Sequence, residues 1–216
     1  MSSKIEIDID ENNLVLYNSL TKSLEYHTKH LDRLAEWTKQ LIQLEKLFPS
    51  AKNNIPYQEL KFLIELNGLV NIVTLDLAVV VQHFYLSKHK WERVFYAKHG
   101  LMLIKETINS YDKFNQRFQK ILSHNGQEIL DSFSTFSKEL RAFKRDYAST
   151  IDPIRNEVAA HISNFNTYYK IINTVDVMKA LVGIQLFLKI INRLQDISAT
   201  LVNIYNTEVD VNFRQH

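Results

Sequence analysis

The sequence predicts an all-α protein, an up-and-down bundle of about five to six helices, several of them long. Apolar residues recur at steps of three and four through most of the 216-residue chain. Only four glycines and three prolines interrupt it, which leaves long uninterrupted stretches and argues against a strand-rich fold with frequent turns. Since neither an internal repeat nor a linker is visible, we expect one domain over residues 13–207. It lies between a flexible acidic segment, 1–12, and a C-terminal tail, 208–216.

The first three expected helices cover residues 13 to 122. The first spans about residues 13–48 and ends before Pro49. Its stripe consists of Leu20, Leu24, His27, Leu31, Leu34, Thr38, Leu41 and Phe48. The second begins after "NNIP" and has a stripe from Leu60 to Phe84, and the third has a stripe from Trp91 to Leu122. The sequence leaves open whether "LSKHK", residues 86–90, separates these two helices or only bends one.

The fourth expected helix has the most regular apolar stripe, formed by Ile129, Phe133, Phe136, Leu140, Phe143 and Tyr147. Asp152 then predicts an N-cap, and Pro153 predicts the first position of a fifth helix. This helix is expected to weaken or break at "SNFNT", residues 163–167. The last helix begins at about Val175 and carries its stripe through Ile204.

Composition and charge limit the cellular compartment and the binding partners that we expect for the protein. The formal net charge is only +2, so no global field attracts nucleic acid. The chain has no cysteine and its first residues lack the pattern of a secretion signal, so we expect a cytoplasmic protein. Residues 69–86 are strongly apolar, but polar residues such as Asn71, Thr74 and Asp76 recur among them, and these are costly in lipid. The segment therefore predicts a buried bundle helix, with no membrane span.

The sequence lacks the residues that several kinds of binding site require. The four glycines are scattered, which excludes a glycine-rich phosphate loop and a dinucleotide-binding fingerprint. No Glu is followed three places later by His, so the ligands of a di-metal bundle are missing. His27 and His30 lie one helical turn apart, but a zinc site needs two further ligands and none is adjacent in sequence. We interpret these histidines as structural or surface residues, and we expect no metal and no cofactor.

One stretch carries candidate catalytic residues: "IDPIRNEVAAHI", residues 151–162, with Arg155, Asn156 and His161. Their order resembles the motif of the HEPN (higher eukaryotes and prokaryotes nucleotide-binding) domains, many of which cleave RNA without a metal. Such cleavage requires a base, an acid and a cation that stabilises the phosphorane charge. His161 would act as base or acid, because an unperturbed imidazole has a pKa near 6.5. Arg155 would grip the scissile phosphate with its planar guanidinium, and Asn156 would orient the phosphate or the imidazole.

Arg155-Asn156 followed by His161, with five residues between Arg and His, resembles the motif of the HEPN domains. The resemblance covers about residues 60–205. It implies a four- or five-helix bundle, often a homodimer, and in many members a metal-independent endoribonuclease of a toxin–antitoxin or antiviral system. RNA and a cognate antitoxin protein would then be partners. Arg93 with His99 and Arg117 with His124 have similar spacings, but Val94 and Phe118 stand where the motif has a polar residue.

A second interpretation of the same stretch stays open. Six residues separate Arg155 from His161, so the two side chains point about 120° apart on an ideal helix. They would share a site only if the helix ended or bent there, or if a two-fold dimer combined residues of two chains. His161 also continues a stripe with Ile154, Val158 and Phe165, which is typical of a core position. The alternative is a non-catalytic helical-bundle interaction module that binds protein or nucleotide.

Overall fold

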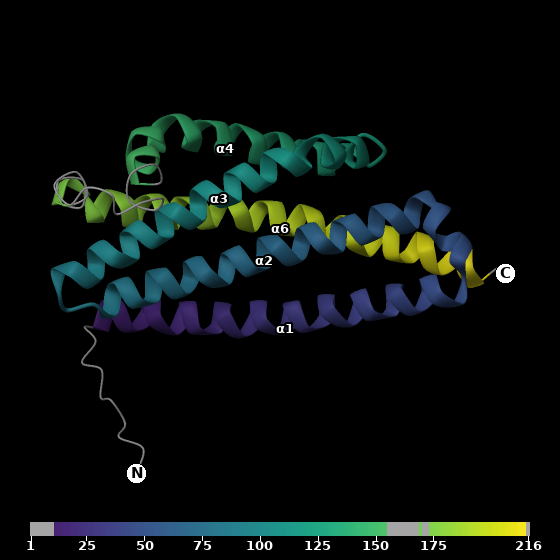
Figure 1. The fold of residues 1–216 in the computed structure, drawn as a ribbon, viewed down its shortest axis with the longest axis horizontal. Coiled ribbons are helices and arrows are strands. Elements are labelled where there is room, and N and C mark those ends of the chain that lie inside the picture. Colours follow the sequence, from purple (N-terminus) through teal and green to yellow (C-terminus); the bar gives the residue numbers. More distant parts are fainter. Residues whose placement is uncertain (1–10, 155–168, 170–172, 215–216) are drawn as a thin grey trace, which may run out of the picture.

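The computed structural model describes residues 11–154, 169 and 173–214, and it confirms an all-α bundle with several long helices (Figure 1). Within these residues five α-helices are present, together with one 3-10 helix, η1 (Pro49–Asn53). The α-helices are α1 (Glu11–Leu47), α2 (Ile55–Leu86), α3 (Lys90–Leu122), α4 (Gln127–Pro153) and α6 (Val177–Arg214). The last helix thus covers most of the segment that the sequence sets apart as a tail.

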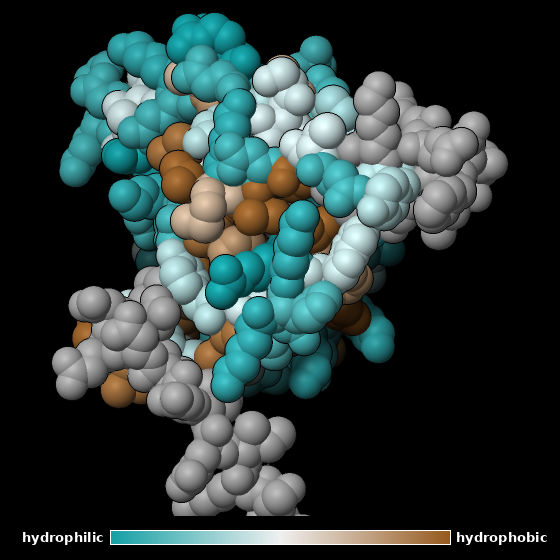
Figure 2. Space-filling model, turned by 90° about the vertical axis from the view of Figure 1, so that its left-hand side faces the viewer, coloured by the Kyte–Doolittle hydropathy of each residue, from teal (hydrophilic) through white to brown (hydrophobic). Residues whose placement is uncertain are grey.

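Helix α2 is the central element of the bundle. It packs against α1, α3 and α6, whereas α4 packs against α6 and α3 (Figure 1). By length and composition alone, α2 is the one helix of the described residues that could cross a membrane, and more than half of its most apolar window is buried inside the bundle. Viewed from the end where α2 finishes and α3 begins, hydrophobic residues gather at the centre with hydrophilic residues around them (Figure 2). The core therefore extends along α2 to this end.

Short polar caps set the limits of the central helices. The side chain of Asn54 accepts a hydrogen bond from the backbone N–H of Tyr57, so α2 starts at Ile55 and places Pro56 in its first turn, where a missing N–H costs nothing. His89 caps α3 in the same manner, with Nδ1 accepting from the N–H of Trp91. The stretch 86–90 therefore separates two helices.

The prediction for Asp152 and Pro153 is wrong. The two residues close the last turn of α4 and do not begin another helix. The carboxylate of Asp152 binds Lys105 of α3 at 2.7 Å, so it joins α3 to α4. Pro153 lies in the final turn, where its missing N–H removes one helical hydrogen bond to the carbonyl four residues before it.

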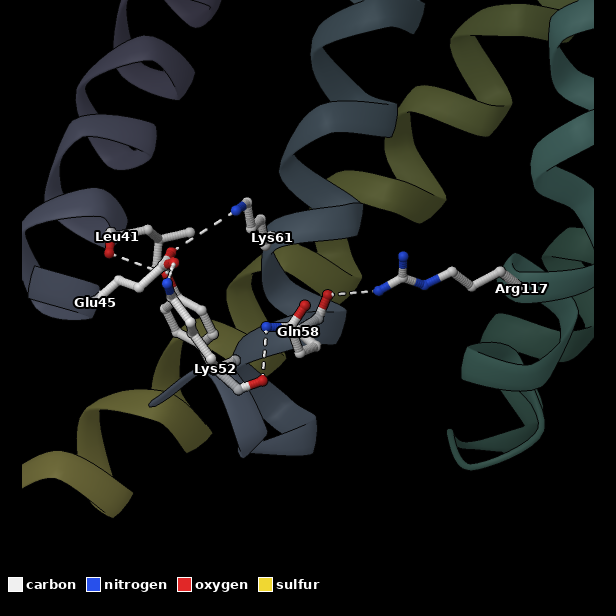
Figure 3. A network of polar contacts seen from close by, with 7 residues as sticks. Leu41, Glu45, Lys52, Gln58, Lys61 and Arg117 are labelled. Atoms are coloured by element: carbon white, nitrogen blue, oxygen red, sulfur yellow. Dashed lines mark hydrogen bonds and ion pairs between the residues drawn. The ribbon is translucent and has the colours of Figure 1, made fainter. Parts of the chain in front are cut away.

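A polar cluster fixes the turn from α1 through η1 into α2 (Figure 3). The hydroxyl of Tyr57 lies 3.0 Å from the backbone oxygen of Leu41 and 2.9 Å from the carboxylate of Glu45. Glu45 also binds Lys52 at 3.1 Å. Burial raises the pKa of Tyr57 to about 12, and the hydrogen bond to Glu45 adds to this shift, so the hydroxyl keeps its proton at neutral pH.

Two glycines in helix interiors differ in their surroundings. A Cβ at Gly100 in α3 would lie 2.9 Å from Cγ1 of Ile184 in α6 and 3.1 Å from Cγ1 of Val80 in α2. A Cβ at Gly68 in α2 would meet no atom within 4 Å. Close packing of three helices therefore requires a glycine at position 100, whereas packing within the described part of the chain does not require one at 68.

We predict that the same substitution has opposite effects at these two positions. Gly68→Ala should raise the free energy of unfolding by about 0.5–1 kcal/mol through helix propensity alone. Gly100→Ala should lower it, because overpacking costs about 1–3 kcal/mol and exceeds that gain. Urea denaturation followed by circular dichroism measures both changes. Equal stabilisation by the two substitutions would contradict the close packing at Gly100.

Candidate functional site

The predicted catalytic residues Arg155, Asn156 and His161 lie outside the described residues. The chain is described up to Ile154, which directly precedes Arg155 and is buried in the core. Ile154 is the first residue of the stripe that the sequence predicts through His161, and a residue of such a stripe is expected to be buried. The roles assigned to Arg155, Asn156 and His161 stay predictions.

The two other arginines with a similarly spaced histidine have structural contacts. Nε of Arg93 donates to the backbone oxygen of Ser87 at 3.1 Å, which joins the start of α3 to the end of α2. Arg117 donates to the backbone oxygen of Gln58 at 2.8 Å (Figure 3), and its guanidinium lies 4.4 Å from the ring centre of Phe62. Both guanidinium groups therefore hold helices together.

The described residues bring six polar side chains together where α1, α2 and α6 meet. We call this group the buried polar network: His27, His30, Asn67, Asn71, Gln195 and Ser198. All are buried except His30, which is half-buried. Their hydrogen bonds connect residues from three helices, so the network fixes how these helices sit against one another.

Backbone carbonyls decide which atoms of the network donate. The backbone oxygen of His27 can only accept, so the atom of Asn71 that lies 2.7 Å from it is the donor Nδ2. Oδ1 of Asn71 must then accept, from Nδ1–H of His27 at 2.6 Å and from Nε2 of Gln195 at 2.9 Å. Nε2 of Gln195 also lies 3.2 Å from Nδ1 of His27, but that nitrogen carries the proton given to Asn71. This last contact is therefore not a hydrogen bond.

The same logic fixes the other half of the network. Nδ2 of Asn67 donates to the backbone oxygen of Gln195 at 3.2 Å and to Oγ of Ser198 at 2.7 Å. Oδ1 of Asn67 therefore accepts from Nε2–H of His30 at 2.7 Å. His27 and His30 thus donate through different ring nitrogens, each to an asparagine of α2.

The network contains one weak point and one perturbed group. Oε1 of Gln195 is buried and has no hydrogen-bond partner among the described residues, a situation that costs about 1–3 kcal/mol. Burial lowers the pKa of His27, although the hydrogen bond to Asn71 opposes that shift. His27 is thus held as a neutral imidazole. Within the described residues no three His, Asp or Glu side chains form a group that could hold a metal ion.

Polar residues at helical spacing mark this network in the sequence, although the apolar periodicity does not reveal it. Asn67 and Asn71 lie four residues apart in an apolar helix, and His27 and His30 lie three apart in the stripe of another helix. Buried polar groups require partners, so two polar pairs at helical spacing in two neighbouring helices indicate contact. Gln195 and Ser198, three apart in α6, complete the same pattern.

We predict that His27 makes stability depend on pH. The unfolded chain binds a proton at this position near the ordinary value of 6.5, and the folded chain does so only at lower pH. Between these two values the unfolded state holds more protons, so the free energy of unfolding falls as the pH falls through 6.5 towards the lower value of the folded chain. His27→Gln keeps an N–H donor for Asn71 without titrating, and its free energy of unfolding should fall less.

Urea denaturation at a series of pH values measures this difference. His124→Gln, at an exposed position after α3, serves as the control and should keep the pH dependence of the parent protein. The same slope in His27→Gln as in the parent protein would show that burial does not suppress protonation of His27.

Comparison with known proteins gives no relative: no protein-family model, curated protein or solved structure matches this chain. The HEPN-like motif is therefore an observation on this sequence alone. The buried polar network and the surfaces beside it are observations on this structure alone.

Proposed function

We propose that this chain is a helical-bundle interaction module that pairs with a second copy of itself through the outward side of α2. The observation that carries the proposal is a row of exposed aliphatic side chains on a helix whose other sides are covered. Leu69 is 46% exposed, Ile72 45% and Val79 39%. Single exposed aliphatics are ordinary, but an apolar row on one helix face is typical of an interaction surface.

This row belongs to a regular pattern, which we call the α2 outer face: Glu65, Leu69, Ile72, Asp76, Val79 and His83. All six residues are exposed, and their spacings are 4, 3, 4, 3 and 4. A 4-3 spacing is what two helices require to pack along a shared seam. The α2 outer face spans 19 residues, about 27 Å of helix, which is long enough for such a seam.

The charges on the α2 outer face favour a second copy as its occupant. When two copies of α2 lie antiparallel about a two-fold axis at residue 74, Glu65 of one copy faces His83 of the other. Leu69 then faces Val79, and Ile72 faces Asp76. A two-fold interface needs a surface that complements itself, and the carboxylate–imidazole pair would occur twice. Asp76 would face Ile72 near the middle of the seam in both copies, and a polar residue at such a position costs stability and selects one alignment.

Two neighbouring features support close approach of another helix. Gly68 lies beside Leu69, and packing within the described part of the chain does not require a glycine there. The open space at this position leaves room for a helix that passes over the α2 outer face. Between α2 and α3 there is also an apolar groove of about 230 Å³, lined by Leu69, Val73, Leu103 and Phe114 among others. This groove adjoins the outer face at Leu69 and would receive a side chain of the second copy.

We predict that Ile72→Asp weakens pairing. It would place a carboxylate at the centre of the apolar row, and the dissociation constant of the dimer should rise about tenfold or more. The matched control is Val182→Asp, which changes another exposed aliphatic residue, on α6. Analytical ultracentrifugation over a range of concentrations measures both variants against the parent protein.

The charge pair can be tested separately. His83→Glu should weaken the dimer by placing two carboxylates opposite each other, and adding Glu65→Lys should restore it. A monomeric parent protein, or a dimer unaffected by Ile72→Asp and His83→Glu, overturns the proposal. Binding to lipid vesicles should be measured as well, since α2 is also apolar enough to cross a membrane. Binding of the parent protein to vesicles, lost in Ile72→Asp, would assign the α2 outer face to a membrane instead.

RNA binding and cleavage is the second candidate function, and it is supported by the Arg155-Asn156…His161 motif directly after α4. The structural contacts of Arg93 and Arg117 make these arginines less suited to hold a phosphate. Arg155 would hold the scissile phosphate, His161 would transfer the proton and Asn156 would orient one of them. A cognate antitoxin protein would then be a further partner.

We predict that this candidate function shows as cleavage of mixed RNA in the presence of EDTA. Arg155→Ala and His161→Ala should each reduce the rate by about 10²-fold or more, because each removes a group needed in the transition state. His124→Ala is the control and should cleave like the parent protein. No cleavage, or cleavage that survives both substitutions, would remove the nuclease interpretation and leave the interaction module.

A further inference from the structure

A pocket of about 200 Å³ lies between α1 and α6, beside the buried polar network. None of the residues that line it belongs to the α2 outer face. Tyr26, His30, Arg33 and Trp37 of α1 line one side at spacings of 4, 3 and 4, and Asn203 of α6 lines the other. Asn67 is the one lining residue from α2, and it is fully buried. From these residues we propose that the pocket binds a small planar ligand that carries an anionic group.

Asn67 gives the pocket a rigid wall. Its Oδ1 accepts from His30, and its Nδ2 donates to the backbone oxygen of Gln195 and to Ser198. Every polar atom of this amide therefore has a partner before any ligand arrives. The same hydrogen bond holds the imidazole of His30, whose plane is parallel to the ring of Tyr26 within 2°. A pocket whose walls are already ordered loses little conformational entropy when it binds a ligand.

The electrostatics of the pocket favour an anion. Arg33 is exposed and has no interaction with another described side chain, so its guanidinium is available to a ligand. Within the described residues no Asp or Glu lines the pocket. A guanidinium binds a carboxylate or phosphate through two parallel hydrogen bonds.

The aromatic side chains favour a planar ring next to that anion. Tyr26 and Trp37 flank Arg33 on the same face of α1, one on each side, and Trp37 is half-buried. Aromatic rings bind planar groups by stacking, and the amide of Asn203 offers both a donor and an acceptor at the pocket edge. The ligand class is therefore an aromatic ring that bears one phosphate or one carboxylate. An aromatic phosphate and an aromatic carboxylate both combine a planar ring with an anion.

The fluorescence of Trp37 provides the test. Trp91→Phe removes the other tryptophan, at an exposed position at the start of α3, and leaves Trp37 as the reporter. The probes are adenosine 5′-monophosphate for the phosphate source and 4-hydroxybenzoate for the carboxylate source. Adenosine and inorganic phosphate supply the ring and the anion alone. We expect a saturable change in emission with at least one of the complete probes, at a lower concentration than with either part.

Arg33→Gln in the same background should raise the dissociation constant of the complete probe about tenfold or more, because it removes a charge-assisted hydrogen bond. It should leave binding of adenosine unchanged. Arg141→Gln, on α4, is the matched control and should bind like the parent protein. No saturable change with any probe overturns the proposal, as does equal binding by Arg33→Gln and Arg141→Gln. Saturation by one complete probe and not the other identifies the anion. Neither result depends on whether the chain forms dimers or cleaves RNA.

Discussion

Burial of α2 against three other helices is the constraint on which the rest of the structure depends. A helix that packs on α1, α3 and α6 must be apolar around most of its circumference, and each buried polar side chain in it needs a hydrogen-bond partner. Asn67 and Asn71 find theirs in His27, His30, Gln195 and Ser198. The part of α2 that remains uncovered is narrow, which is why an aliphatic row on it is informative.

Most of the fold could be predicted from the sequence, because helical periodicity is a local property. The expected first helix, residues 13–48, matches α1 within two residues at its start and one at its end. Prediction failed where a long-range contact competes with a local one. The Asp-Pro pair at 152–153 has the local features of a helix start, but Lys105, 47 positions earlier in the chain, binds the carboxylate and α4 continues.

The candidate sites were less predictable, for a related reason. A motif such as Arg155-Asn156…His161 is visible because its residues are close in sequence. The hydrogen bonds that link different helices in the buried polar network join residues 37 to 131 positions apart, and only folding brings them together. The sequence gives the spacing within each helix, such as Asn67 to Asn71, but not which helices become neighbours. The stripe of α1 illustrates this limit, since His27 was visible in it as a polar member while its partners in α2 and α6 were not.

The hydrogen bonds of Asn71 also determine how α1 is aligned along the axis of α2. The stripe of α1 repeats every seven residues through Leu20, His27, Leu34 and Leu41, so apolar packing alone would tolerate a shift by one repeat. Either shift would bring a leucine, Leu20 or Leu34, opposite the amide of Asn71. The amide would then be buried without its imidazole donor. The hydrogen bond between two uncharged side chains thereby favours one alignment of two helices, each more than thirty residues long, over a shift by one repeat.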